Sequence, residues 1–150
     1  GAHLRSIAQY NFPLRFLRYA RGAELAGTPF MDMGRAVHRL SGELADFIGV
    51  DAGTIRVGDR ADVVIVNPAG LTDELDEIHE APMEVLGLER VVKRNDAAVD
   101  ATLINGRIAY RRGSEFPHEL GKQQGFGCFL PGREVLPRAA TAQDCKPITV

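Results

Sequence analysis

Histidines are the side chains best suited to bind a catalytic metal, and the four in this sequence, His3, His38, His79 and His118, each stand alone. A hydrolytic metal site needs three or four ligands that converge on one ion. The spacings typical of such sites, His-x-His, His-Glu-x-x-His and Cys-x-x-Cys, do not occur. We therefore predict no metal ligands in this chain and expect each histidine to be a surface or helix-face residue.

A nucleophilic mechanism has no more support. The sequence contains neither a Gly-x-Ser-x-Gly elbow nor a phosphate-binding loop with its lysine. The two cysteines, Cys128 and Cys145, have no metal-type spacing and form no disulfide framework. No histidine motif adjoins Cys128 to activate its thiol. We expect Cys128 to be a buried, inert thiol in a reducing cytoplasmic setting, and we predict no catalytic residue.

Residues 53–68 form the strongest structural pattern in the sequence. The β-branched residues within 54–57 predict one short strand, and Gly58-Asp59-Arg60 predicts a tight turn after it. Residues 63–66 are four consecutive β-branched residues, which indicates a strand covered on both faces. Pro68 lacks the N–H that would continue the pairing.

A second β-pattern lies at residues 100–110. Asn105-Gly106 supplies the two central residues of a type I′ turn, both of which need positive φ. Strand-forming residues flank this dipeptide on both sides, and Gly113 is placed to end the second strand. We also expect a short strand within residues 86–92.

Helices are predicted to precede these strands. Asn11-Phe12-Pro13 marks the start of the first one, because proline suits the first helical position. We expect Gly22 to interrupt it and its arginines, Arg15, Arg18 and Arg21, to form a solvated face.

The second helical segment is predicted to begin at the N-cap residue Asp32 and to end at Gly49. Ser41-Gly42 is expected to interrupt it and to start a new helix. Its apolar residues recur every three or four positions and predict one continuous buried stripe; they are Met33, Val37, Leu40, Leu44 and Phe47.

Composition is that of an ordinary globular domain. The 150 residues are 45% hydrophobic and 25% charged, with a net charge of −2. This balance gives no electrostatic reason to expect nucleic acid or an anionic membrane as a partner. We predict an α+β fold: helices in residues 1–50, antiparallel strands in 51–115 with an acidic insertion at 69–82, and an irregular segment with a tail in 116–150.

The pattern Gly-x-Ile-x-x-Gly-x-x-Ala-Asp, followed by residues 63–66, resembles the strand pair near the C-terminus of amidohydrolase-superfamily enzymes. Residues 1–15 are similar to the segment after the eighth barrel strand in the D-aminoacylase and N-acyl-D-amino-acid deacylase branch. The resemblance covers about residues 1–130. It implies that residues 1–50 are a loop and helices from the end of a β/α barrel and that the strands of 51–115 belong to a small β-sandwich beside it. It implies that this chain is the C-terminal portion of a metal-dependent enzyme that hydrolyses the amide bond of N-acyl-D-amino acids.

The same resemblance implies which parts of the intact enzyme bind the metal and which bind the substrate. Zinc is expected in the intact enzyme but not in this chain, since the metal ligands and the proton-transferring aspartate precede the matching segment in the family. Arg5 is then the candidate for binding the substrate carboxylate, with His3 as a weaker neighbour, because a guanidinium binds a carboxylate through two parallel hydrogen bonds. By itself the chain is expected to be inactive.

Two alternatives remain open. The chain is a stand-alone β-rich binding or scaffold module, or it is one subunit of a split hydrolase. As a portion of a larger enzyme, it is expected to pair with the missing N-terminal barrel portion or to self-associate, because strand edges and the barrel-facing side of the first helix need covering.

Overall fold

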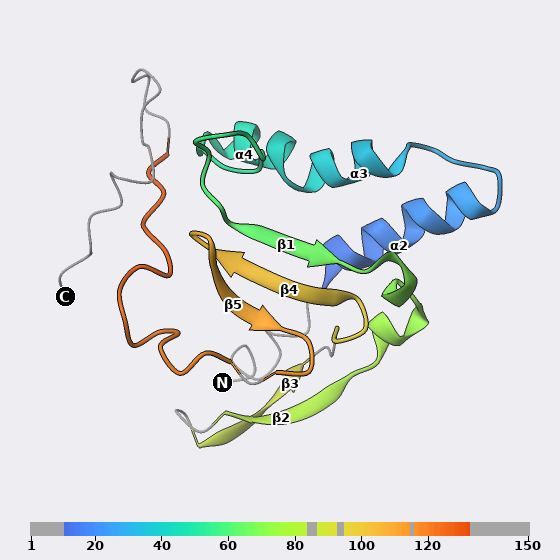
Figure 1. The fold of residues 1–150 in the computed structure, drawn as a ribbon. Coiled ribbons are helices and arrows are strands. Elements are labelled where there is room, and N and C mark those ends of the chain that lie inside the picture. The colour runs from blue at the N-terminus through green and yellow to red at the C-terminus, as the bar shows by residue number, and fades with distance from the viewer. Residues whose placement is uncertain (1–10, 84–86, 93–94, 115, 133–150) are drawn as a thin grey trace.

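A computed structural model of the chain describes residues 11–83, 87–92, 95–114 and 116–132. Helices come first and antiparallel strands follow, so the α+β fold is confirmed (Figure 1). The candidate residues His3 and Arg5 and the tail from residue 133 onward lie outside the described residues.

The three α-helices of the described residues follow the local signals in the sequence. Helix α2 (Phe12–Leu25) has proline in its first turn, and α3 (Met33–Leu40) begins where the Asp32 carboxylate accepts a hydrogen bond from the Arg35 amide at 2.8 Å. Helix α4 (Gly42–Ile48) begins after the break at Ser41 and ends at Gly49, whose φ is 78°. Gly22 stays helical, so the interruption expected there is wrong.

The strands form two small antiparallel sheets. Strands β1 (Val63–Val66), β4 (Val99–Ile104) and β5 (Arg107–Arg111) form one sheet in the order β1-β4-β5. Strands β2 (His79–Met83) and β3 (Leu88–Val92) form the other. Two 3-10 turns, Pro68–Gly70 and Asp73–Asp76, follow β1, and the last residues of the predicted acidic insertion, 79–82, belong to strand β2. Residues 116–132 contain no helix or strand, as expected for that segment.

The hairpin tip is tied to the residues before β1. Asn105 and Gly106 both have positive φ, 51° and 76°, as the predicted turn requires. The Asn105 amide donates to the Asp62 carboxylate at 2.6 Å, and the Gly106 amide donates to the Ala61 carbonyl at 2.9 Å. The Ala-Asp pair of the 53–68 pattern therefore holds the hairpin in place.

The strand predicted within residues 54–57 does not form. The turn after it does form, closed by a 3.0 Å hydrogen bond from the Asp59 amide to the Arg56 carbonyl. Ile55 and Val57, however, project into solvent from an irregular loop. Their β-propensity yields no strand because no neighbouring strand of the described residues pairs with them.

The core of the described residues is built mainly from small side chains. Five of its nine buried apolar residues are alanines, and no large side chain is fully buried. The main cluster joins Leu17 and Ala20 of α2 to Ala36 of α3, Leu71, Leu75 and Ala98.

Two predictions of burial are wrong. On β1, Val64 and Ile65 are about half exposed, although neighbouring residues of a strand point to opposite faces. Both faces of β1 are therefore open at its centre. On the helices, Val37, Leu44 and Phe47 of the predicted buried stripe are exposed.

Candidate functional site

The histidines of the described residues do not converge. His38 on α3 lies 3.1 Å from an Arg35 guanidinium nitrogen, and His118 lies 3.2 Å from the Lys122 ammonium. His79 lies on β2. Among the described residues, no group of three or more His, Cys, Asp or Glu side chains is arranged to hold a metal ion. This finding concerns the described residues alone, and the zinc site that the family resemblance implies was expected to have its ligands outside this chain.

Cys128 differs from its prediction. The side chain is half-buried, and its sulfur is disulfide-bonded and also accepts a hydrogen bond from Arg60. The expectation of a buried free thiol at this position is wrong.

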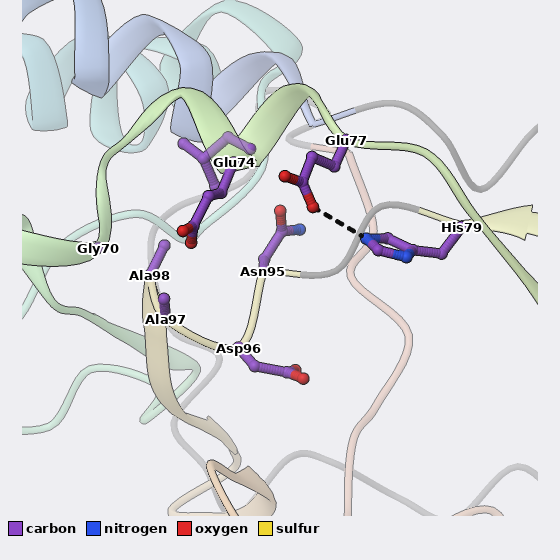
Figure 2. A pocket seen from close by; sticks show the side chains of 9 residues that line it. Gly70, Glu74, Glu77, His79, Asn95, Asp96, Ala97 and Ala98 are labelled. Atoms are coloured by element: carbon purple, nitrogen blue, oxygen red, sulfur yellow. Dashed lines mark ion pairs between the residues drawn. The ribbon is translucent and has the colours of Figure 1, made fainter.

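The described residues enclose an acidic cavity of about 240 Å³ (Figure 2). It lies where the 3-10 turn Asp73–Asp76 faces the turn before β4. Its lining consists of Gly70, Glu74, Leu75, Glu77, His79, Asn95, Asp96, Ala97 and Ala98. At this volume it falls below the range of about 300–1,000 Å³ that is usual for small-molecule sites.

The residues directly after β1 build the wall of this cavity. The Asn67 amide donates to the Ala98 carbonyl at 2.8 Å, and the Asn67 side chain accepts from the Ala69 amide at 3.0 Å. A Cβ on Gly70 would lie 1.9 Å from the Ala97 carbonyl oxygen, so only glycine permits this approach. These contacts were not predicted from the sequence, although the dipeptide Asn67-Pro68 is typical of a turn.

Carboxylates and one histidine give the cavity its chemistry. Glu77 Oε2 lies 3.6 Å from His79 Nε2, which is an ion pair when the histidine is protonated (Figure 2). Asp96 accepts a 3.0 Å hydrogen bond from the Tyr110 hydroxyl. Burial, followed by this hydrogen bond to Asp96, raises the pKa of Tyr110 above its ordinary value of 10.0. The acidic lining favours cations, but it includes no nucleophile paired with a base.

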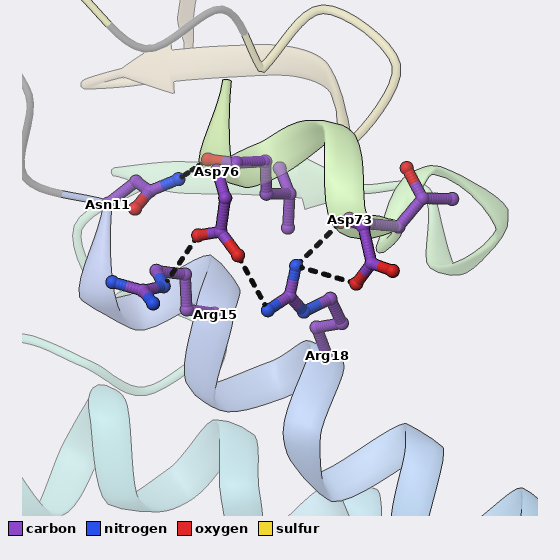
Figure 3. A network of polar contacts seen from close by, with 7 residues as sticks. Asn11, Arg15, Arg18, Asp73 and Asp76 are labelled. Atoms are coloured by element: carbon purple, nitrogen blue, oxygen red, sulfur yellow. Dashed lines mark hydrogen bonds and ion pairs between the residues drawn. The ribbon is translucent and has the colours of Figure 1, made fainter. Parts of the chain in front are cut away.

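Two arginines of α2 make ion pairs that the prediction of a solvated face did not include, although Arg15 stays 55% exposed. Arg15 and Arg18 both bind the Asp76 carboxylate, at 2.8 and 3.0 Å, and Arg18 also lies 3.2 Å from Asp73 (Figure 3). Beside them the buried Asn11 side chain donates to the Leu75 carbonyl. These contacts hold the start of α2 against the acidic insertion.

Comparison with known proteins gives long relatives without an assigned activity. In an alignment 139 residues long that covers 90% of this chain, the sequence is 45% identical to proteins of Mycobacterium tuberculosis and Mycobacterium bovis, both described as uncharacterized. The aligned segment is 23% of each relative, so the chain spans about a quarter of their length. No family model matches the chain, and no solved structure matches it.

None of the helices in the described part of the chain combines the length and the apolar character needed for a membrane span.

Proposed function

We propose that this chain is the C-terminal portion of a metal-dependent amidohydrolase that hydrolyses N-acyl-D-amino acids. The main observation in support of the proposal is that the pattern at residues 53–68 and the hairpin at Asn105-Gly106 contact each other. The Ala61-Asp62 pair of the amidohydrolase-like stretch receives the Asn105-Gly106 turn through two backbone-donated hydrogen bonds. The patterns on which the resemblance depends most are thus joined in one sheet, β1-β4-β5.

The first half of the stretch weakens this support. Ile55 lies in a loop, whereas the family resemblance implies a strand there. The proposal therefore depends on β1, on Asp62 and on the hairpin, and it takes nothing from residues 54–57.

The long relatives favour a portion of a larger protein over a stand-alone module. They are more than four times as long as the segment that aligns with this chain. The small side chains of the core and the open faces of β1, an edge strand, agree with this interpretation, because an independent domain of this size usually buries more of its large apolar side chains.

In this proposal zinc and the groups that react at it belong to polypeptide outside the described residues. Zinc would polarise the amide carbonyl and activate the attacking water. This chain would cover one side of the catalytic domain and offer Arg5, with His3 beside it, to the substrate carboxylate. Its location in the cytoplasm is part of the proposal.

The test is hydrolysis of N-acetylated D- and L-amino acids by the full open reading frame, loaded with zinc, and by this chain alone. We expect the full protein to release free D-amino acid and the isolated chain to release none. Arg5→Ala in the full protein should raise KM more than it lowers kcat, and Arg21→Ala on α2 serves as the matched control. An inactive zinc-loaded full protein, or equal activity in the isolated chain, would refute the proposal.

A further inference from the structure

Helix α4 buries its small residues and exposes its large apolar ones, which is unusual for a helix on a protein surface. The residues that it buries against the described chain are the small Gly42 and Ala45. The large apolar residues of the same helix point outward: Phe47 is 88% exposed, and Leu44 and Ile48 are also exposed. A helix that covers a core normally buries its large apolar residues and exposes polar ones.

Close packing explains why small residues face inward. A Cβ on Gly42 would lie 3.3 Å from the Gly53 carbonyl oxygen, and one on Gly53 would lie 2.6 Å from the Ser41 carbonyl carbon. The start of α4 thus packs closely against the loop that leads to β1; Figure 1 shows this loop beside α4. That loop then exposes Ile55 and Val57.

We call the exposed large apolar residues of this helix and of the loop that follows it the α4 surface: Leu44, Phe47, Ile48, Ile55 and Val57. Single exposed apolar residues are common, but several on one short helix and its adjoining loop indicate an interaction site. Their number on so short an element is the reason to look for an occupant.

We propose that the α4 surface packs against an apolar face of the remaining polypeptide of a longer protein to which this chain belongs. The inference rests on the part of the proposed function that places the chain in a longer polypeptide, and it does not require hydrolytic activity. Its main support is the relatives, which are 45% identical over 90% of this chain and continue far beyond it.

A second copy of the chain fits less well. Apolar residues are exposed both on the α4 surface and on the two opposite faces of β1, at Val64 and Ile65. One symmetric contact covers one patch of each copy. A large continuing polypeptide can contact several faces at once.

A membrane also fits less well. Helix α4 has seven residues, includes Glu43 and Asp46, and contains no lysine or arginine. Helices that lie in a membrane interface usually have a basic polar face.

Cysteine labelling tests the proposal. Phe47→Cys is made in this chain alone and in the full open reading frame, and its reaction with a maleimide is timed in both. We expect labelling in the full protein to be slower by roughly tenfold or more, as for a group shielded by packing. Leu25→Cys is the matched control, since Leu25 is 74% exposed and also lies at the C-terminal end of a helix; it should react at similar rates in both proteins.

Three results would overturn the proposal: equal labelling of Phe47→Cys in both proteins, a reading frame that encodes no further polypeptide, or protection in the isolated chain. Sedimentation identifies a second copy as the cause of such protection, and flotation with phosphatidylcholine–phosphatidylglycerol vesicles identifies a membrane. Protection of Phe47→Cys in a full protein that hydrolyses no N-acyl amino acid would leave this inference standing and refute only the enzymatic one.

Discussion

Replacing Asn11 with alanine should destabilise the chain more than its single hydrogen bond suggests. Asn11 is 6% exposed and is the one buried polar residue of the described chain. Its side-chain amide donates to the carbonyl of Leu75, which is itself 2% exposed. Asn11→Ala removes the donor and leaves this carbonyl in a site with little access to water.

The expected loss follows from that burial. An unsatisfied buried carbonyl costs about 1–3 kcal/mol, so we expect a loss of about 2 kcal/mol in the free energy of unfolding. Asn11→Asp should cost at least as much, because it removes the donor and places a carboxylate next to the carbonyl oxygen. Asp76→Ala should cost less, about 1 kcal/mol, since its carboxylate is 41% exposed and its two arginine contacts are screened by solvent.

Urea unfolding followed by far-UV circular dichroism measures these differences. The midpoint should fall while the m-value stays constant, which indicates a change in stability without a change in the surface exposed on unfolding. Asp73→Ala is the control, because Asp73 contacts the same Arg18 but is fully exposed. If Asn11→Ala lowers the midpoint no more than Asp73→Ala does, then Asn11 does not fasten α2 as we describe.

Three further predictions concern single backbone or side-chain features. Gly70→Ala should cost about 3 kcal/mol or more in urea unfolding, because its Cβ would clash with the Ala97 carbonyl, and an unchanged midpoint would contradict this. Asn105→Ala should cost about 1 kcal/mol in the same assay, whereas Asn105→Gly should be nearly neutral, because φ is positive at this position. Tyr110 should ionise above pH 10.0 in the difference spectrum between the wild type and Tyr110→Phe. Because folding raises the pKa of Tyr110, the neutral hydroxyl should stabilise the folded state fully below pH 10. This stabilisation should be lost as the pH rises through the folded pKa, and Tyr110→Phe should not show that loss.

Features fixed by nearest neighbours could be predicted from the sequence. Asp32 caps α3, Gly49 ends α4 in a left-handed conformation, and Asn105-Gly106 makes the hairpin turn. In each case the residue satisfies a backbone requirement within a few positions of itself. Such requirements do not depend on what the rest of the chain packs against.

Features fixed by distant partners could not be predicted. From the sequence, Arg15 is predicted to be a solvated helix residue. In the structure the 3-10 turn brings Asp76, 61 positions later, beside it. The acidic cavity depends in the same way on the approach of Gly70 to Ala97. A single sequence without an alignment contains no signal for pairs so far apart. The substrate role of Arg5 and His3 stays a prediction, since both lie outside the described residues.

The errors in the predicted burial of apolar side chains share a direction. Val64, Phe47 and Ile55 all lie in apolar patterns typical of covered strands or helices, and all three are exposed in the described structure. The error on Arg18, which is 24% exposed, is of another kind, because its guanidinium is partly covered in ion pairs with Asp73 and Asp76. Hydrophobic patterning records where a sequence is buried in its complete assembly, and the conformation of one part need not reveal it. The exposed apolar residues agree with the proposal that other polypeptide covers them, and β1 and α4 are the two elements at which to look for it.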